Sequence, residues 1–147
     1  MFEMDWRYTK PVKPERIQEV ETELNVRFPN SFVECVKKNN AGRPNAILFD
    51  LGNDKEKVFG NLFDFNDSEY GLSILEAYES LVDEHEAPKE LIPFADDPAG
   101  NFICFDYRSI NNGEPAVVFF YHERDEDNIR RISNSFEDFI NKLYEPK

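Results

Sequence analysis

The fold is decided between residues 102 and 121, where the chain reads FICFDYRSINNGEPAVVFFY. The apolar runs at 102–107 and 116–121 are typical of β-strands, and Asn111-Asn112-Gly113 between them has the composition of a tight turn. A further short strand is predicted at 129–132, after a charged tip. Strands joined by short turns favour an antiparallel meander over a parallel, doubly wound sheet.

Helices are predicted before and after this meander in the sequence. Apolar residues recur with helical spacing at 14–25, 30–39 and 73–83, and again from Phe136 to Tyr144. Pro14 suits the first turn of a helix, and Ser73 and Ser135 each precede an acid at capping-box spacing. We expect a hairpin with strands at 46–51 and 58–65, joined by a loop slightly longer than the tightest type, and a short extended piece between Pro88 and Pro93.

The predicted fold class is therefore α+β, with an antiparallel meander and helices packed mainly on one of its faces. We expect one domain over residues 1–147, which begins with an extended entry segment at 1–13. The residues expected in the core are Phe32, Val36, Phe102, Cys104, Val118 and Phe136.

The charge of the chain limits what it can bind. Of its 147 residues, 30 are acidic and 17 are basic, so the formal net charge is −13. Binding to nucleic acid or to anionic lipid needs a basic surface, and we therefore expect neither partner. Aromatic residues make up 14% of the sequence, whereas disordered acidic chains are poor in them. The sequence predicts a folded domain with an acidic surface.

The cellular compartment is expected to be the cytoplasm. Cys35 and Cys104 lie far apart among apolar residues, which is typical of reduced thiols rather than of a disulfide scaffold. The first residues have no basic segment followed by an apolar one, so no signal peptide is predicted. No apolar stretch approaches the roughly 20 residues of a membrane span.

No enzyme signature is evident. A phosphate-binding glycine loop, a Cys-x-x-Cys pair and a His-Glu-x-x-His motif are all absent from the sequence. Cys104, Asp106, His122 and Glu123 could be zinc ligands, but a buried thiol beside exposed polar strand ends is the favoured interpretation. The acids at Asp64, Asp67 and Glu69 lack the glycine and the distal glutamate of a calcium loop. We expect no catalytic residues, no metal and no cofactor.

Acidic residues gather in four segments, at 64–69, 83–86, 96–97 and 123–127. Charge of this kind keeps a protein soluble, and it can equally form a docking surface for a basic partner. Acids at the end of the predicted third helix oppose the helix dipole, so helix stability does not explain them. Charge alone leaves both interpretations open.

The sequence resembles the SUKH superfamily, in its Smi/Knr-like branch. The resemblance lies in four blocks, which follow one another in the order of the family. They are Leu24-Asn25-Val26-Arg27-Phe28-Pro29 with Ser31-Phe32 and Asn39-Asn40-Ala41-Gly42; Leu91-Ile92-Pro93-Phe94-Ala95 with residues 96–106; Pro115-Ala116-Val117-Val118 with Tyr121-His122-Glu123; and Ser135-Phe136-Glu137-Asp138-Phe139-Ile140. The sequence departs from the family at Phe28, where Leu is usual, at Ala41, where the first of two glycines is usual, and at Asn101, where Asp is common.

The resemblance implies a non-catalytic binding protein. Many bacterial members are immunity proteins that neutralise a toxin, often a nuclease, and others are scaffolds or regulators with an endogenous partner. We expect a cognate, basic toxin domain as the partner and a monomer or weak dimer as the free state; a regulatory scaffold is the alternative, and an acidic-loop metalloenzyme is a remote third. The residues expected to bind the partner are Asp83, Glu84, Glu86, Asp96, Asp97, Tyr107, Tyr121, Glu123, Asp125, Glu126 and Asp127.

Overall fold

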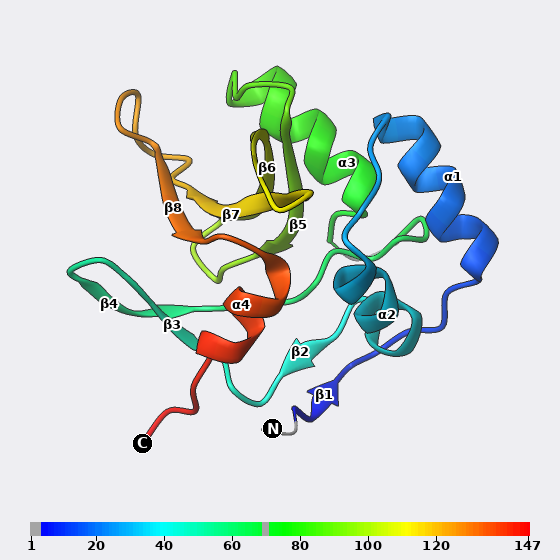
Figure 1. Cartoon of the computed structure of the whole chain (residues 1–147), viewed down its shortest axis with the longest axis horizontal. Coiled ribbons are helices and arrows are strands. Elements are labelled where there is room, and N and C mark those ends of the chain that lie inside the picture. Colours follow the sequence, from blue (N-terminus) through cyan, green and yellow to red (C-terminus); the bar gives the residue numbers. More distant parts are fainter. Residues whose placement is uncertain (1–3, 69–70) are drawn as a thin grey trace.

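The computed structural model describes residues 4–68 and 71–147. It has the predicted α+β architecture, in which helices surround antiparallel sheets (Figure 1). The elements are β1 (Trp6–Arg7), α1 (Pro14–Leu24), α2 (Asn30–Asn39), β2 (Arg43–Pro44), β3 (Leu48–Leu51), β4 (Asp54–Val58), α3 (Ile74–Glu79), the π-helix η1 (Ser80–Glu84), β5 (Leu91–Asp96), β6 (Phe102–Asn111), β7 (Glu114–Phe120), β8 (Ile129–Ser133) and α4 (Phe136–Lys142).

The main sheet is the predicted meander, with strand order β5-β6-β7-β8 and every neighbouring pair antiparallel. Asn111 pairs with Glu114, so Asn112 and Gly113 form a two-residue turn. Their φ angles are 51° and 82°. Positive φ at both positions is what a hairpin turn that matches the strand twist requires, and Asn-Gly supplies it at low cost. This part of the sequence prediction is confirmed.

The first strand of the sheet extends beyond the predicted piece. β5 continues through Pro93, which pairs with Cys104, and ends at Asp96. Proline has no N–H to donate, but β5 is the edge strand of this sheet, where a missing donor is tolerated. The two prolines therefore do not bound the strand.

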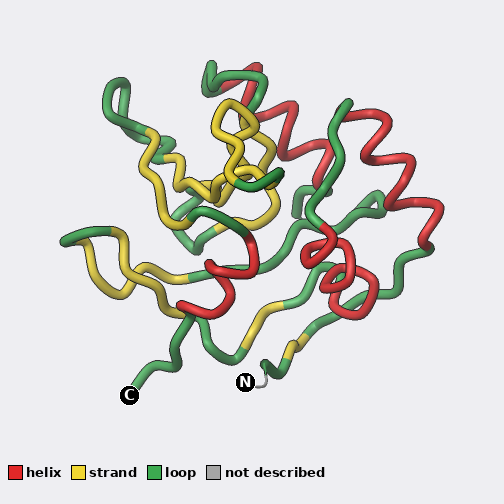
Figure 2. The backbone as a smooth tube through the Cα atoms, viewed as in Figure 1, coloured by secondary structure: helices red, strands yellow, loops and turns green. Residues whose placement is uncertain are grey.

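The predicted hairpin at 46–65 is only partly correct. Leu51 pairs with Asp54, so the loop is of the tightest type, and β4 ends at Val58. The following segment, residues 59–65, is irregular rather than a strand, and we call it the irregular segment (Figure 2). Its backbone N–H groups bond to carbonyl groups of several different elements: Phe59 to Ile47, Gly60 to Asp96, Leu62 to Gly42 and Phe63 to Phe94. It is buried because it fills the space between these elements, and not because it belongs to a ladder.

The aromatic core lies between the main sheet and two helices. Phe32 of α2 and Phe136 of α4 both contact Phe94 and Phe105 of the sheet, with ring centroids 5.0–6.1 Å apart. On the opposite face, the ring of His85, just after η1, contacts Phe102 at 5.7 Å. All of the residues predicted for the core are buried, with exposed fractions of at most 5%.

Serine hydroxyl groups cap two of the helices, as their spacing predicts. Ser73 forms a complete capping box with Glu76, and Ser135 Oγ accepts a hydrogen bond of 3.1 Å from the Asp138 N–H. The N-terminal N–H groups of a helix have no partner within the helix, so each such bond satisfies a donor that would otherwise be unpaired. α4 ends at Lys142, a little before the predicted Tyr144.

We expect Ser135→Ala to lower the free energy of unfolding by about 0.5–2 kcal/mol, the usual contribution of an N-cap. Ser31→Ala is the matched control, because the Ser31 hydroxyl is buried without a hydrogen-bond partner in the described structure. Losing an unsatisfied hydroxyl should be neutral or stabilising. Urea unfolding of both variants measures the difference; equal losses would show that the Ser135 bond contributes nothing.

Candidate functional site

The two histidines of the chain make contacts that join three acidic segments. His85 follows η1, His122 follows β7, and their ring centroids lie 5.9 Å apart in an edge-to-face contact. His122 Nε2 donates a hydrogen bond to the carbonyl of Ala99 (2.8 Å), which lies in the turn after β5. Segments 83–86, 96–101 and 121–127 therefore meet at one end of the β6–β7 pair.

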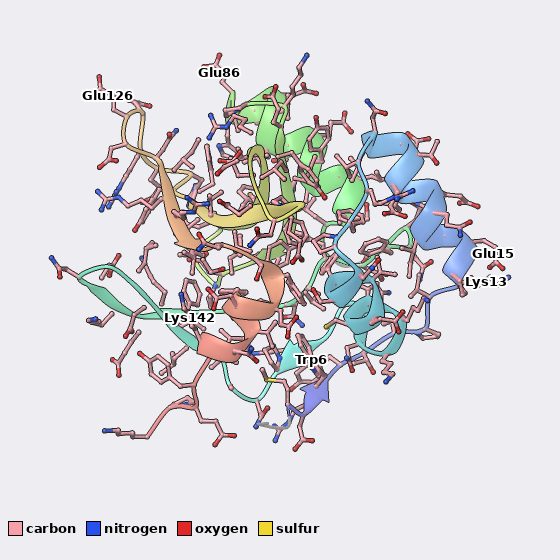
Figure 3. All side chains as sticks on the ribbon, viewed as in Figure 1. Trp6, Lys13, Glu15, Glu86, Glu126 and Lys142 are labelled. Carbon is pink, nitrogen blue, oxygen red and sulfur yellow. The ribbon has the colours of Figure 1, made fainter. Side chains whose placement is uncertain are left out.

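Most acids of these segments are exposed at this end. Figure 3 shows Glu86 and Glu126 projecting along the same side of the molecule, well away from Glu15 on α1. We call this surface the acidic edge and define it by its exposed carboxylates: Asp83, Glu84, Glu86, Glu123, Asp125, Glu126 and Asp127.

Few cations neutralise the acidic edge. Asp127 pairs with Arg130, and Glu123 lies 4.0 Å from His122. Within residues 4–68 and 71–147, the other carboxylates of the edge form no ion pair with a Lys, Arg or His of the chain. Exposed carboxylates without partners can accept hydrogen bonds from arginine or lysine side chains of another protein.

The π-helix explains how the first part of the acidic edge is presented. α3 widens into η1 at Ser80, and His85 then donates its N–H to the carbonyl of Ser80 (3.2 Å). Glu86 follows with φ 54°, which turns the chain back toward β5. Single π turns inside helices are rare and occur frequently at functional sites. The predicted helix at 73–83 thus has the right position, but its last turn is not α-helical.

The loop between β7 and β8 carries the second part of the acidic edge. Internal contacts hold this loop in place, and we call residues 121–128 the braced tip. The guanidinium of Arg124 lies 3.7 Å from the centroid of the Tyr121 ring, and its Nη1 donates to the carbonyl of Asp127 (3.3 Å). Tyr121 N–H donates to the carbonyl of Asn128 (2.8 Å), which closes the loop. Arg124 is therefore used inside the tip and leaves Asp125 and Glu126 uncompensated.

The prediction that the acids of 96–97 lie in an exposed loop is wrong for Asp97. Asp97 is 8% exposed, and its carboxylate accepts hydrogen bonds from the N–H groups of Ala99 (3.0 Å) and Asn101 (2.7 Å). It organises the turn that supports His122. Asp96 is half-buried and points to Gly60 and Asn61, away from the acidic edge.

Neither of the two tyrosines predicted as interface anchors has its ring exposed at the acidic edge. Tyr121 is 8% exposed and lies under Arg124, and its hydroxyl donates to Asp54 (3.3 Å). Tyr107 donates its hydroxyl to the carbonyl of Arg27 (2.8 Å), and burial raises its pKa. It lies on β6, roughly 17 Å along the strand from the end that carries the acidic edge.

The residues considered as metal ligands have other roles. Cys104 is fully buried, and burial followed by the charge of Asp106 raises the pKa of its thiol well above the ordinary value. Asp106 pairs with Arg108 at 3.0 Å, and Asp64 accepts a hydrogen bond from Asn40. Glu69 lies outside the described residues. Within the part of the chain that the structure describes, no three His, Cys, Asp or Glu side chains are grouped so that they could hold a metal ion.

The chain matches the model of a known protein family. Residues 11–142 match the SMI1 / KNR4 family (SUKH-1). The chain belongs to this family. Its members include toxin-immunity proteins, and the match spans every element from α1 to α4. No curated protein matches the chain. No helix formed by residues 4–68 and 71–147 is long and apolar enough to cross a membrane.

Proposed function

We propose that this SUKH-1 protein is a non-catalytic, cytoplasmic immunity protein that neutralises a basic toxin domain by covering it. The observation that carries this proposal is the acidic edge, where segments distant in the sequence present uncompensated carboxylates around the His85–His122 contact. Family membership supports it, since the family includes toxin-immunity proteins.

The charge of the acidic edge suits a nuclease-type toxin. A protein that cleaves nucleic acid must bind phosphate, and its cleft is therefore basic. A carboxylate surface attracts such a cleft over a long range, raises the association rate and can then occlude the cleft. The braced tip at 121–128 also reduces the entropy lost on binding, because the loop is ordered before the partner arrives.

The test is the association rate with the toxin domain encoded beside this gene. We expect the triple variant Glu123→Lys, Asp125→Lys, Glu126→Lys to associate about tenfold more slowly at low salt, with the difference shrinking at high salt because ions screen the attraction. The matched control is Glu15→Lys, Glu19→Lys, Glu23→Lys, which makes the same charge change on the exposed face of α1.

The control should retain most of the wild-type rate, since the reversed charges lie away from the proposed interface. If the two triple variants associate equally fast, net charge alone matters and the acidic edge is not the docking surface. If the neighbouring genes encode no toxin and an endogenous protein binds instead, the alternative of a regulatory scaffold replaces the immunity role.

A further inference from the structure

A second candidate recognition site lies apart from the acidic edge. A pocket of about 300 Å³ opens between the entry segment, the irregular segment after β4 and the end of β5. Two carboxylates, Asp64 and Asp96, and one cation, Lys10, line it. Tyr8 and Leu72 also line it, and they belong to the small group of large apolar residues that are well exposed, at 71% and 43%.

The Asp96 carboxylate occupies the space that a side chain at position 60 would fill. A Cβ atom on Gly60 would lie 2.2 Å from Asp96 Oδ1, so any side chain at position 60 would displace the carboxylate. Asp96 Oδ1 accepts a hydrogen bond from the Asn61 N–H (2.9 Å), and the backbone of Asp96 bonds to both Gly60 and Asn61. Position and orientation of this side chain are thus set by the backbone around it.

The Asp96 carboxylate has no close ion-pair partner; Arg43 acts on it only from a longer distance. Within residues 4–68 and 71–147 no Lys, Arg or His side chain forms an ion pair with it, and the hydrogen bond from the Asn61 N–H goes to Oδ1 rather than to Oδ2. Burial raises the pKa of Asp96 because the ionised form is poorly solvated. The hydrogen bond from Asn61 and the charge of Arg43 oppose this effect, the charge of Asp97 adds to it, and the pKa is raised on balance. A partly desolvated carboxylate with a free acceptor gains free energy from a cation that binds beside it.

The other charges of the pocket are already engaged. Asp64 is 6% exposed; it accepts hydrogen bonds from Asn40 (2.8 Å) and the Asn66 N–H (2.9 Å), and it lies 3.7 Å from Lys10. Lys10 is therefore directed to Asp64 rather than to Asp96. Asp96 is the acid of this pocket that remains for an external group.

We propose that this pocket binds the guanidinium group of an arginine side chain presented by the protein partner. Asp96 Oδ2 accepts its N–H groups, while the exposed ring of Tyr8 and the side chain of Leu72 offer apolar surface to its plane and its methylene stem. Arginine fits better than lysine, because its planar group both stacks on an aromatic ring and donates several parallel hydrogen bonds. The identity of the partner rests on the proposed function, but the chemistry of the pocket does not.

The pocket can be tested without any toxin. We expect N-acetyl-arginine amide to shift the backbone amide NMR signals of Asn61 and Leu62 in a saturable manner, with a dissociation constant on the order of millimolar, as for a single small contact. N-acetyl-citrulline amide, which has nearly the same shape without the charge, should bind at least tenfold more weakly. N-acetyl-lysine amide should fall between the two.

Two variants locate the binding site. Asp96→Asn keeps an oxygen that can accept the Asn61 N–H, so the fold is retained, and we expect at least tenfold weaker binding of the arginine probe. Tyr8→Ala removes a side chain that is 71% exposed, and it should weaken binding about threefold without changing stability. Glu23→Gln removes an exposed carboxylate on α1, outside both the pocket and the acidic edge, and should have no effect.

The proposal is overturned if citrulline binds as well as arginine, if Asp96→Asn binds like the wild type, or if the probe causes no saturable shift. None of these results affects the acidic edge, which the association-rate experiment tests separately. Conversely, saturable and Asp96-dependent binding of arginine supports the pocket even if the charge-reversed variants associate normally with the toxin domain.

Discussion

Replacing Phe32 with alanine will lower the free energy of unfolding by about 3–5 kcal/mol, the usual cost of removing a buried aromatic side chain. Phe32 is 1% exposed and lies at the centre of the aromatic core. Its ring contacts other rings from the α1–α2 loop, the irregular segment, the main sheet and α4. These are Phe28, Phe65, Phe94, Phe105 and Phe136, at centroid distances of 5.0–6.0 Å.

The size of this effect follows from the number of elements that meet at one side chain. Truncation removes buried apolar area and leaves a cavity, and it also removes the edge-to-face geometry of several ring pairs. Chemical unfolding followed by circular dichroism measures the loss. Ile110→Ala is the control, because Ile110 is 52% exposed at the end of β6; its effect should stay within about 0.5 kcal/mol. A loss at Phe32 no larger than this would contradict the packing described above.

The regular part of the fold could be predicted from the sequence because local signals and burial agree there. The strands β6 and β7 combine long apolar runs with an Asn-Gly turn, and α1 combines a proline at its start with a clear apolar stripe. In these elements the apolar runs of the strands and the apolar stripe of the helix match the observed burial. Local sequence is then sufficient.

The irregular segment could not be predicted in the same way. Phe59, Leu62, Phe63 and Phe65 are all buried, and an apolar run of this length looks like a buried strand. Its conformation is set by hydrogen bonds to β5 and to the segments around Ile47 and Gly42. Those partners are distant in the sequence, so no local pattern reveals them.

The candidate site was predictable in its charge but not in its geometry. Sequence showed that acids cluster, whereas burial of Asp97 and Tyr121 depends on how the turn after β5 packs against His122. One local signal was present: Asp followed by Pro, Ala and Gly is typical of a turn in which the Asp side chain bonds to its own backbone. The contact between His85 and His122 has no such signal, because β5, β6 and β7 lie between the two residues in the sequence.

Replacing Asn40 with alanine will lower the free energy of unfolding by about 2–5 kcal/mol, since it takes hydrogen-bond partners away from a buried N–H and a buried carboxylate. Asn40 is 1% exposed and joins the end of α2 to the irregular segment. Its Nδ2 donates to Asp64 Oδ1 (2.8 Å), and its Oδ1 accepts the N–H of Phe65 (2.9 Å). Alanine removes both bonds: the buried Phe65 N–H loses its partner, and the buried Asp64 carboxylate keeps only the Asn66 N–H and Lys10.

The neighbouring residue supplies the control. Asn39 is also at the end of α2, but its side chain has only a long contact, 3.9 Å, with the sulfur of Cys35. Asn39→Ala should therefore cost less than about 1 kcal/mol, the range of a weak surface contact. Equal losses in the two variants would mean that helix termination, and not the bridge to Asp64, makes position 40 important.

A second variant separates lost hydrogen bonds from lost volume. Asn40→Asp keeps the shape of the side chain and the bond from the Phe65 N–H, but it places a second carboxylate against Asp64. Near neutral pH the like charges should destabilise the fold by at least as much as alanine does. Lowering the pH should restore part of the loss, because a protonated carboxyl can donate to its neighbour as the amide did. If Asn40→Asp is as stable as the wild type near neutral pH, Asn40 fills space rather than holds the acidic segment in place.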